Sequence, residues 1–211
     1  MSLALAPATL PSEAVLEGRL VRLEPLAERH LPPLVAIALA HPEEYRLTST
    51  PASAAAADAY FGRVFAQRAA GTAHPVAVVL RDGGRVVGTS RLSEVELGHR
   101  RCELGFSWLD PACFGTGVNV ESKLLLLAFA FERLAMHRVQ IHTDTRNLRS
   151  QRAIEALGAR QEGVLRRHQV AKDGYVRDTV VYGITDLDWP EVRARLEGRL
   201  ARSLARRAVA G

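Results

Sequence analysis

Runs of apolar and β-branched residues predict where the strands lie. PVAVVL (75–80) and RVVGTSRL (85–92) flank Asp82-Gly83-Gly84, which is typical of a β-hairpin closed by a glycine-rich turn. The same pattern predicts further strands at residues 20–25, 101–109, 137–144 and, around a second turn, 161–184.

Apolar residues spaced three and four apart predict five helices. They are expected at residues 32–39, 52–70, 117–135, 147–157 and from 189 onward. Gly158 follows the fourth helix and fits the left-handed position that often ends a helix. The order of strands and helices predicts a mixed α/β (α+β) single domain with flanking helices.

Composition places the chain among globular proteins. Apolar residues make up 47% and charged residues 24% of 211 positions, enough for a sizeable core. The longest apolar run, Leu124 to Phe131, is far shorter than the ~20 residues that cross a bilayer. Residues 1–15 lack the early positive charge of a secretory signal, so we expect a flexible N-terminal extension and a cytoplasmic protein with no membrane contact.

Most of the net charge of +5 falls in the last part of the chain, 189–211. Leu196, Leu200 and Leu204 recur among its arginines every four residues, which predicts a basic amphipathic helix. We favour a helix that packs its leucines on the domain and turns its arginines to water. No nucleic-acid partner is expected, although the basic tail leaves docking on RNA open.

A glycine turn joins the strand at 101–109 to the helix after it. Gly115 and Gly117 precede the first helical turn, whose unpaired N–H groups and positive dipole end favour an anion such as a phosphate. G-x-G also makes ordinary tight turns. No Gly-Lys-Ser/Thr follows, so this is not the phosphate loop of nucleotide hydrolases.

Four motifs in order resemble the GNAT superfamily of acyl-CoA-dependent N-acyltransferases, in particular its ribosomal-protein alanine N-acetyltransferase (RimJ/RimL-like) branch. They are an opening EGRLVRLEPL, a Glu in the strand before the glycine turn, Asn-x-x-Ser at 147–150, and a closing EG, DG, D and Y pattern. The resemblance spans about 17–189. We therefore expect an acyltransferase domain at 16–188, followed by the basic helix or tail.

The resemblance implies a mostly antiparallel sheet that splays at a central parallel strand pair, 101–109 and 138–143. Coenzyme A, as acetyl-CoA, would lie in this gap with its pyrophosphate on the glycine turn. The implied cofactor-binding residues are Trp108, Leu109, Thr116, Gly117, Val118, Asn119, Asn147 and Ser150. No metal is expected, because the seven histidines show no ligand spacing.

Two residues depart from the family's phosphate loop. Phe114 stands where Gln or Arg is expected, and Asn119 stands where a very small residue is expected. We expect weakened rather than abolished binding, because backbone amides do not depend on side-chain identity. Arg149 and Arg152 are candidates for the ribose phosphate; a solvated helix face is the alternative for both.

Amine acylation needs an acceptor for the amine proton and an acid for the departing thiolate. Glu103 is the predicted base, with Leu104 and Phe106 expected to desolvate it and raise its pKa. The alternative is a surface glutamate paired with an arginine such as Arg101. Ser150 is the predicted acid, although it could merely satisfy the first turn of its helix.

Several other residues are weaker candidates. Glu94 and Glu96, expected in a loop near the same part of the sheet, are alternative bases. His142 lies on the predicted splayed strand, and Tyr175 and Tyr182 could line an acceptor pocket or belong to the core.

These observations favour an enzyme that moves an acetyl group from acetyl-CoA to a primary amine, small-molecule or peptide, by direct attack in a ternary complex. The sequence does not identify the acceptor and leaves a homodimer open. The main alternative is a non-catalytic acyl-CoA-binding or regulatory module whose tail docks on RNA or a protein. An unrelated nucleotide-binding protein is disfavoured by the missing phosphate-loop lysine.

Overall fold

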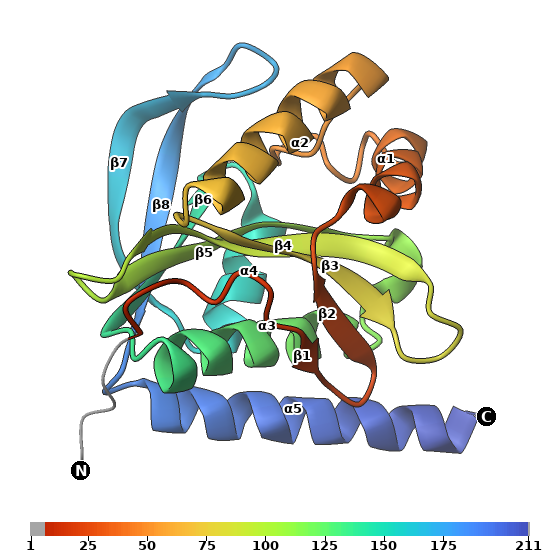
Figure 1. The fold of residues 1–211 in the computed structure, drawn as a ribbon, viewed down its shortest axis with the longest axis vertical. Helices are drawn as coiled ribbons and strands as arrows, with labels where there is room; N and C mark the ends of the chain where they lie inside the picture. The colour runs from red at the N-terminus through yellow and green to blue at the C-terminus, as the bar shows by residue number, and fades with distance from the viewer. Residues whose placement is uncertain (1–6, 211) are drawn as a thin grey trace.

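The computed structural model describes residues 7–210, with side chains to 208, and builds them on one eight-stranded sheet in the order β1-β2-β3-β4-β5-β6-β8-β7 (Figure 1). The strands are β1 (Leu16–Glu17), β2 (Val21–Pro25), β3 (His74–Leu80), β4 (Val86–Glu96), β5 (Arg101–Leu109), β6 (Arg138–Asp144), β7 (Arg160–Val170) and β8 (Val176–Thr185). The predicted strands are all present.

The five predicted helices are also present. They are α1 (Leu31–Ala40), α2 (Ala54–Ala69), α3 (Val118–Ala128), α4 (Leu148–Leu157) and α5 (Trp189–Ala210). Short 3-10 turns precede α1 and α3 (Glu28–His30 and Pro111–Cys113), and a π-helical turn, Phe129–Arg133, continues α3. None of the described helices combines the length and apolar composition that crossing a membrane requires.

The sheet has one parallel pairing, between β5 and β6, and it is short. Only Arg101–Glu103 of β5 pair with Arg138–Gln140 of β6. Beyond this point β5 stays paired with β4 as far as Leu109, whereas β6 stays paired with β8 as far as Asp144. The two strands therefore separate after Glu103, which confirms the predicted splayed sheet.

Helices cover both faces of the sheet (Figure 1). On one face, α1 and α2 pack a core around Leu34, Phe61 and Trp108. On the other face, α3 and α4 lie against the sheet and α5 runs below α3, with Leu126 and Leu196 fully buried between them. The two faces thus have separate apolar cores.

The leucines of α5 anchor it to the domain as predicted. Leu196 and Leu200 are buried, and Leu204 is half-buried. At the other end of the chain, Leu10 and Ala14 pack against the core. The predicted flexible extension covers 1–15, of which 1–6 lie outside the described residues.

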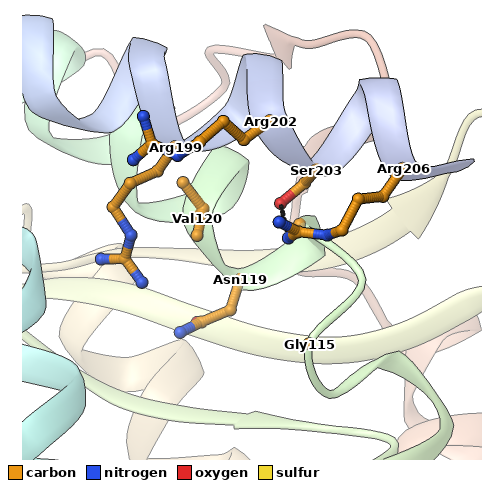
Figure 2. Close-up of a pocket in the computed structure, with 8 residues that line it drawn as sticks. Gly115, Asn119, Val120, Arg199, Arg202, Ser203 and Arg206 are labelled. Carbon is orange, nitrogen blue, oxygen red and sulfur yellow. Dashed lines mark hydrogen bonds between the residues drawn. The ribbon is translucent and has the colours of Figure 1, made fainter.

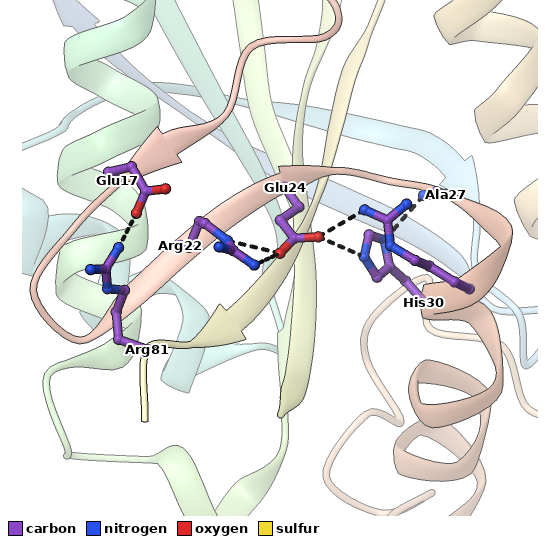
Figure 3. A network of polar contacts seen from close by, with 7 residues as sticks. Glu17, Arg22, Glu24, Ala27, His30 and Arg81 are labelled. Carbon is purple, nitrogen blue, oxygen red and sulfur yellow. Dashed lines mark hydrogen bonds and ion pairs between the residues drawn. The ribbon is translucent and has the colours of Figure 1, made fainter. Parts of the chain in front are cut away.

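A charged network fixes the chain where it leaves the sheet for α1 (Figure 3). The carboxylate of Glu24 on β2 accepts hydrogen bonds from Arg22 and Arg29 and contacts His30 Nε2 at 3.1 Å. Burial alone would raise the pKa of Glu24, but these hydrogen bonds outweigh it and lower the pKa to about 2. Glu24 therefore stays charged at neutral pH.

Candidate functional site

A β-bulge shapes β5 just beyond the point where it leaves β6. Arg91 of β4 pairs with Gly105, whereas Thr89 pairs with Trp108, so two residues of β5 face one of β4. Phe106 in the bulge has a φ of 52°, a strained conformation for a residue with a side chain. The guanidinium of Arg91 lies 3.5 Å from the centroid of its ring. The bulge bends β5 away from β6 and opens the gap.

Glu103 lies at the start of this gap and is 8% exposed. Burial, above all, raises the pKa of Glu103 to about 7, and the nearby carboxylate of Glu94 adds to the effect. Arg91 and Arg177 oppose it without cancelling it. Near neutral pH the carboxyl group therefore divides between its charged and neutral forms, as a general base requires.

The shielding of Glu103 differs from the prediction in one respect. Leu104 points to the opposite face of the sheet and belongs to the core beneath α3, so it does not cover the carboxylate. Gly105 lies beside Glu103 on β5, and a Cβ at this glycine would meet Glu103 Oε1 at 2.9 Å. The surface alternative does not hold, because Glu103 is buried and Arg101 pairs with Glu96 at 2.6 Å instead.

Other titratable groups surround Glu103. Glu94 and Glu96 lie on β4 and not in a loop; Glu94 is exposed, with a φ of 49°. His142 Nδ1 is 3.7 Å from Glu103 Oε2, which is too far for a hydrogen bond. Burial lowers the pKa of His142, so the imidazole is neutral at pH 7. The ring of His168 on β7 is 6.2 Å from that of His142.

Two arginines near Glu103 were not identified from the sequence. The Nε atoms of Arg91 and Arg177 are buried and have no hydrogen-bond partner among the described residues. Trp108 Nε1 is likewise buried and has no hydrogen-bond partner among the described residues. A charged residue inside an apolar strand is the signal that could have revealed Arg91, since Val86–Leu92 is otherwise uncharged. Buried donors without partners suit a polar ligand.

The glycine turn forms as predicted. Gly117 has a left-handed φ of 92° and caps α3, whose first-turn amides have no acceptor within the helix. The hydroxyl of Thr116 donates to the carbonyl of Cys113 at 2.7 Å. Glu121 in the first turn faces away, since its carboxylate accepts backbone hydrogen bonds at the β1–β2 hairpin, including that of Val21 at 2.8 Å. The positive end of α3 is thus left for an external anion.

Phe114, in the place of the family's Gln or Arg, is 44% exposed and contacts Arg149 of α4. The guanidinium of Arg149 is 5.2 Å from the ring centroid. Arg149 also forms an ion pair with Glu44 and donates to the Glu44 carbonyl at 2.5 Å. Arg149 therefore already has a carboxylate partner, whereas the other predicted phosphate ligand of α4, Arg152, is exposed.

Asn147 and Ser150 lie together at the start of α4. Asn147 is the N-cap, and its Oδ1 accepts the backbone N–H of Ser150 at 3.1 Å. This leaves the side-chain amide of Asn147 and the hydroxyl of Ser150 outside the cap. Both groups can therefore serve a ligand without loss of the helix end.

The connection between α1 and α2, residues 41–53, reaches across to both arms of the open sheet. The hydroxyl of Tyr45 donates to the carbonyl of Leu109 at the end of β5, at 2.6 Å. Lys172, between β7 and β8, donates to the carbonyls of Tyr45 and Thr50 at 2.9 and 3.1 Å. The carbonyl of Leu109, one of the residues predicted to contact the cofactor, therefore accepts a hydrogen bond from within the protein. Tyr182 belongs to the core, fully buried.

A cavity of about 340 Å³ lies beside the glycine turn (Figure 2). It is lined by Gly115, Gly117, Asn119 and Val120 and, from α5, by Arg199, Arg202, Ser203 and Arg206. The sequence pattern indicated that these arginines lie on an amphipathic helix but not that they face the turn. Among the residues that the structure describes, no His, Cys, Asp and Glu side chains gather as a metal site.

The chain is similar to several known proteins. Two Bacillus subtilis proteins are similar in sequence: YjcK, named a probable N-acetyltransferase (32% identical over 104 residues), and YdaF, provisionally named a ribosomal N-acetyltransferase (27% over 106 residues). The matches cover 49% and 50% of this chain but only 57% of each relative, so the chain spans little more than half the length of these curated proteins.

A solved structure from T. thermophilus, of a protein assigned as an acetyltransferase, is 41% identical, with a TM-score of 0.76 over 88% of this chain and 96% of that one. The profile of the Acetyltransferase (GNAT) domain family matches residues 20–160, which is more than half of the chain. The chain therefore belongs to the GNAT acetyltransferase family.

Proposed function

We propose that this protein transfers an acetyl group from acetyl-CoA to a primary amine. The observation that carries the proposal is Glu103, a buried carboxyl group with a pKa of about 7 at the point where β5 and β6 separate. A base is most effective when its pKa is near the working pH. The family membership of the chain supports the same chemistry.

The residues at the gap fit acetyl-CoA. The first-turn amides of α3 at 118–120 would receive the pyrophosphate, since a helix N-terminus after a glycine turn favours anions. The side-chain amide of Asn147 would bind the pantetheine arm. When bound, acetyl-CoA supplies an activated thioester, and the protein has only to place the amine and move two protons.

Glu103 accepts a proton from the attacking amine, so that the nitrogen lone pair can form the new bond to the acetyl carbon. The thiolate leaves when the carbon–sulfur bond breaks, and the hydroxyl of Ser150 donates a proton to it, directly or through water. Ser150 then regains a proton from water, and Glu103 releases the amine proton to solvent. This proton balance requires the amine, the thioester and both side chains in one ternary complex. No covalent intermediate on the enzyme is needed.

The acceptor would approach on the face of the sheet that carries Glu103. Arg91 and Arg177 flank the carboxylate there with buried donors. The resemblance to the ribosomal-protein branch and to YdaF favours an α-amine, at a protein N-terminus or on a small molecule. Residues 41–53 would form one wall of the acceptor site, since they are hydrogen-bonded both to the end of β5 and to the β7–β8 hairpin.

The test is acetyl transfer by Glu103→Gln, with Glu17→Gln, at an exposed glutamate on the edge strand β1, as the control. Peptides with different N-termini, amino acids, a polyamine and an aminoglycoside serve as acceptors, with mass spectrometry of the product and free thiol as readouts. We expect Glu103→Gln to lower kcat/KM about 10²- to 10⁴-fold and the control to change little. Equal rates for Glu103→Gln and the unmodified protein would overturn the assignment of the base.

A further inference from the structure

The arginines of α5 that line the cavity beside the glycine turn have no counter-charge. Arg193, about two to four turns earlier on the same helix, pairs with Glu132 and Glu197 at 2.7 and 2.9 Å. Among side chains 7–208, no carboxylate pairs with Arg199, Arg202 or Arg206. Three arginines of α5 thus line one cavity, next to the positive end of α3 (Figure 2).

Contacts fix α5 beside the turn and position two of the three arginines. Ser203 lies directly over Gly117, where a Cβ would come within 2.9 Å of the Ser203 Cβ, so a side chain at this position would push α5 away. Arg206 Nη2 donates to Ser203 Oγ at 3.1 Å, and Arg199 Nη1 donates to the carbonyl of Ala156 at 2.5 Å. The buried leucines of α5 fix the rest of the helix.

The like charges also disfavour the cavity in its unliganded form. Burial lowers the pKa of Arg199, and the neighbouring charges of Arg195 and Arg202 lower it further. A multivalent anion would relieve this repulsion, and planar guanidinium groups bind phosphate oxygens in pairs. The chemistry that fits is therefore a phosphate-bearing ligand that also reaches the turn at Gly117.

We propose that Arg199, Arg202 and Arg206 bind the nucleotide end of acetyl-CoA, above all its terminal 3′-phosphate. This inference rests on the proposed function, which assigns the pyrophosphate to the adjacent first turn of α3. The arginines of α5 then supply the side-chain phosphate contacts that Phe114 does not make. The family profile ends at residue 160, so α5 adds these contacts from outside the matched region.

The test compares the affinities of coenzyme A and 3′-dephospho-coenzyme A by calorimetry. We expect the unmodified protein to prefer coenzyme A, and the double variant Arg202→Gln/Arg206→Gln to lose about 10- to 100-fold in affinity for it, which corresponds to one or two charged hydrogen bonds. Affinity for 3′-dephospho-coenzyme A should change much less. Arg195→Gln, which removes the same charge from an exposed site on the same helix, is the control.

Both substituted arginines are exposed, so the double variant should keep its fold, and circular dichroism checks this. If the unmodified protein binds coenzyme A but the double variant and the control behave alike, the inference is overturned while the proposed function stands. If the unmodified protein does not bind coenzyme A, the proposed function itself fails. Single-stranded RNA is included as a third ligand. If the double variant loses RNA binding and the unmodified protein shows no preference for coenzyme A over 3′-dephospho-coenzyme A, the arginines form a nucleic-acid surface instead.

Discussion

Burial moves the pKa values of two residues to about 7 from opposite directions, upward for Glu103 and downward for Lys123. The reason is the same in both, since burial disfavours the charged form of any group. Glu103 faces the gap, where a proton can be exchanged with a substrate. Lys123 on α3 is enclosed, and its ammonium group donates to Ser90 at 3.1 Å and to Ser107.

Glu103 should lower the stability of the fold at alkaline pH. Because its pKa is raised from 4.5 to about 7, the folded state keeps a proton that the unfolded state releases, so its contribution to the free energy of unfolding falls as pH rises from 4.5 through 7. We expect Glu103→Gln to be more stable than the unmodified protein at pH 8, by on the order of 3 kcal/mol at most, and equally stable near pH 4. Urea unfolding at the two pH values measures this. A difference that does not depend on pH would contradict it.

Lys123 should follow the opposite pH dependence. Its pKa is lowered from 10.5 to about 7, so its cost to folding is full below pH 7 and fades as pH rises toward 10.5. We expect Lys123→Met to raise the melting temperature at pH 6 more than at pH 9, because Ser90 and Ser107 can still bond to each other at 2.7 Å. A lower melting temperature at pH 6 would show that the ammonium group stabilises the fold.

At the scale of elements, the sequence predicts strand bounds and helix caps well where neighbouring residues determine them. The strand expected over 101–109 has its observed bounds, and Asn147 and Gly158 cap α4 as their side-chain chemistry and φ freedom require. The bulge at Phe106 was not predicted, because its positive φ depends on the packing of Arg91 from the next strand. Glu94 and Glu96 were expected in a loop but lie on β4. Pairing with β5 extends this strand to Glu96, and the local sequence does not reveal that pairing.

The 41–53 connection is held by contacts between distant parts of the chain, so a single change should loosen it. Lys172→Gln removes the donor shared by the carbonyls of Tyr45 and Thr50. We expect amide hydrogen exchange in 41–53 to become about tenfold faster, as the loss of roughly one hydrogen bond implies, with little change in α3. Unchanged exchange in this segment would show that Tyr45 alone anchors it.

At the scale of the whole molecule, the proposed site draws on three separate parts of the chain. β5 contributes Glu103, the turn after it contributes the amides of α3, and α4 contributes Asn147 and Ser150. The ordered motifs point to these residues because each motif follows a strand end or opens a helix, and their joint role stays a prediction. They could not predict the arginines of α5, whose place depends on how the last helix packs across α3.

The central claim, that Glu103 accepts the amine proton during acetyl transfer, is tested most directly by the pH dependence of the reaction. With an acceptor amine of low pKa, kcat/KM of the unmodified protein should rise with pH and level off above an apparent pKa near 7, because the carboxylate form is the active base. Glu103→Gln should be slower at every pH and show no such transition. A transition near pH 7 that persists in Glu103→Gln would contradict the account and assign the proton transfer to another group.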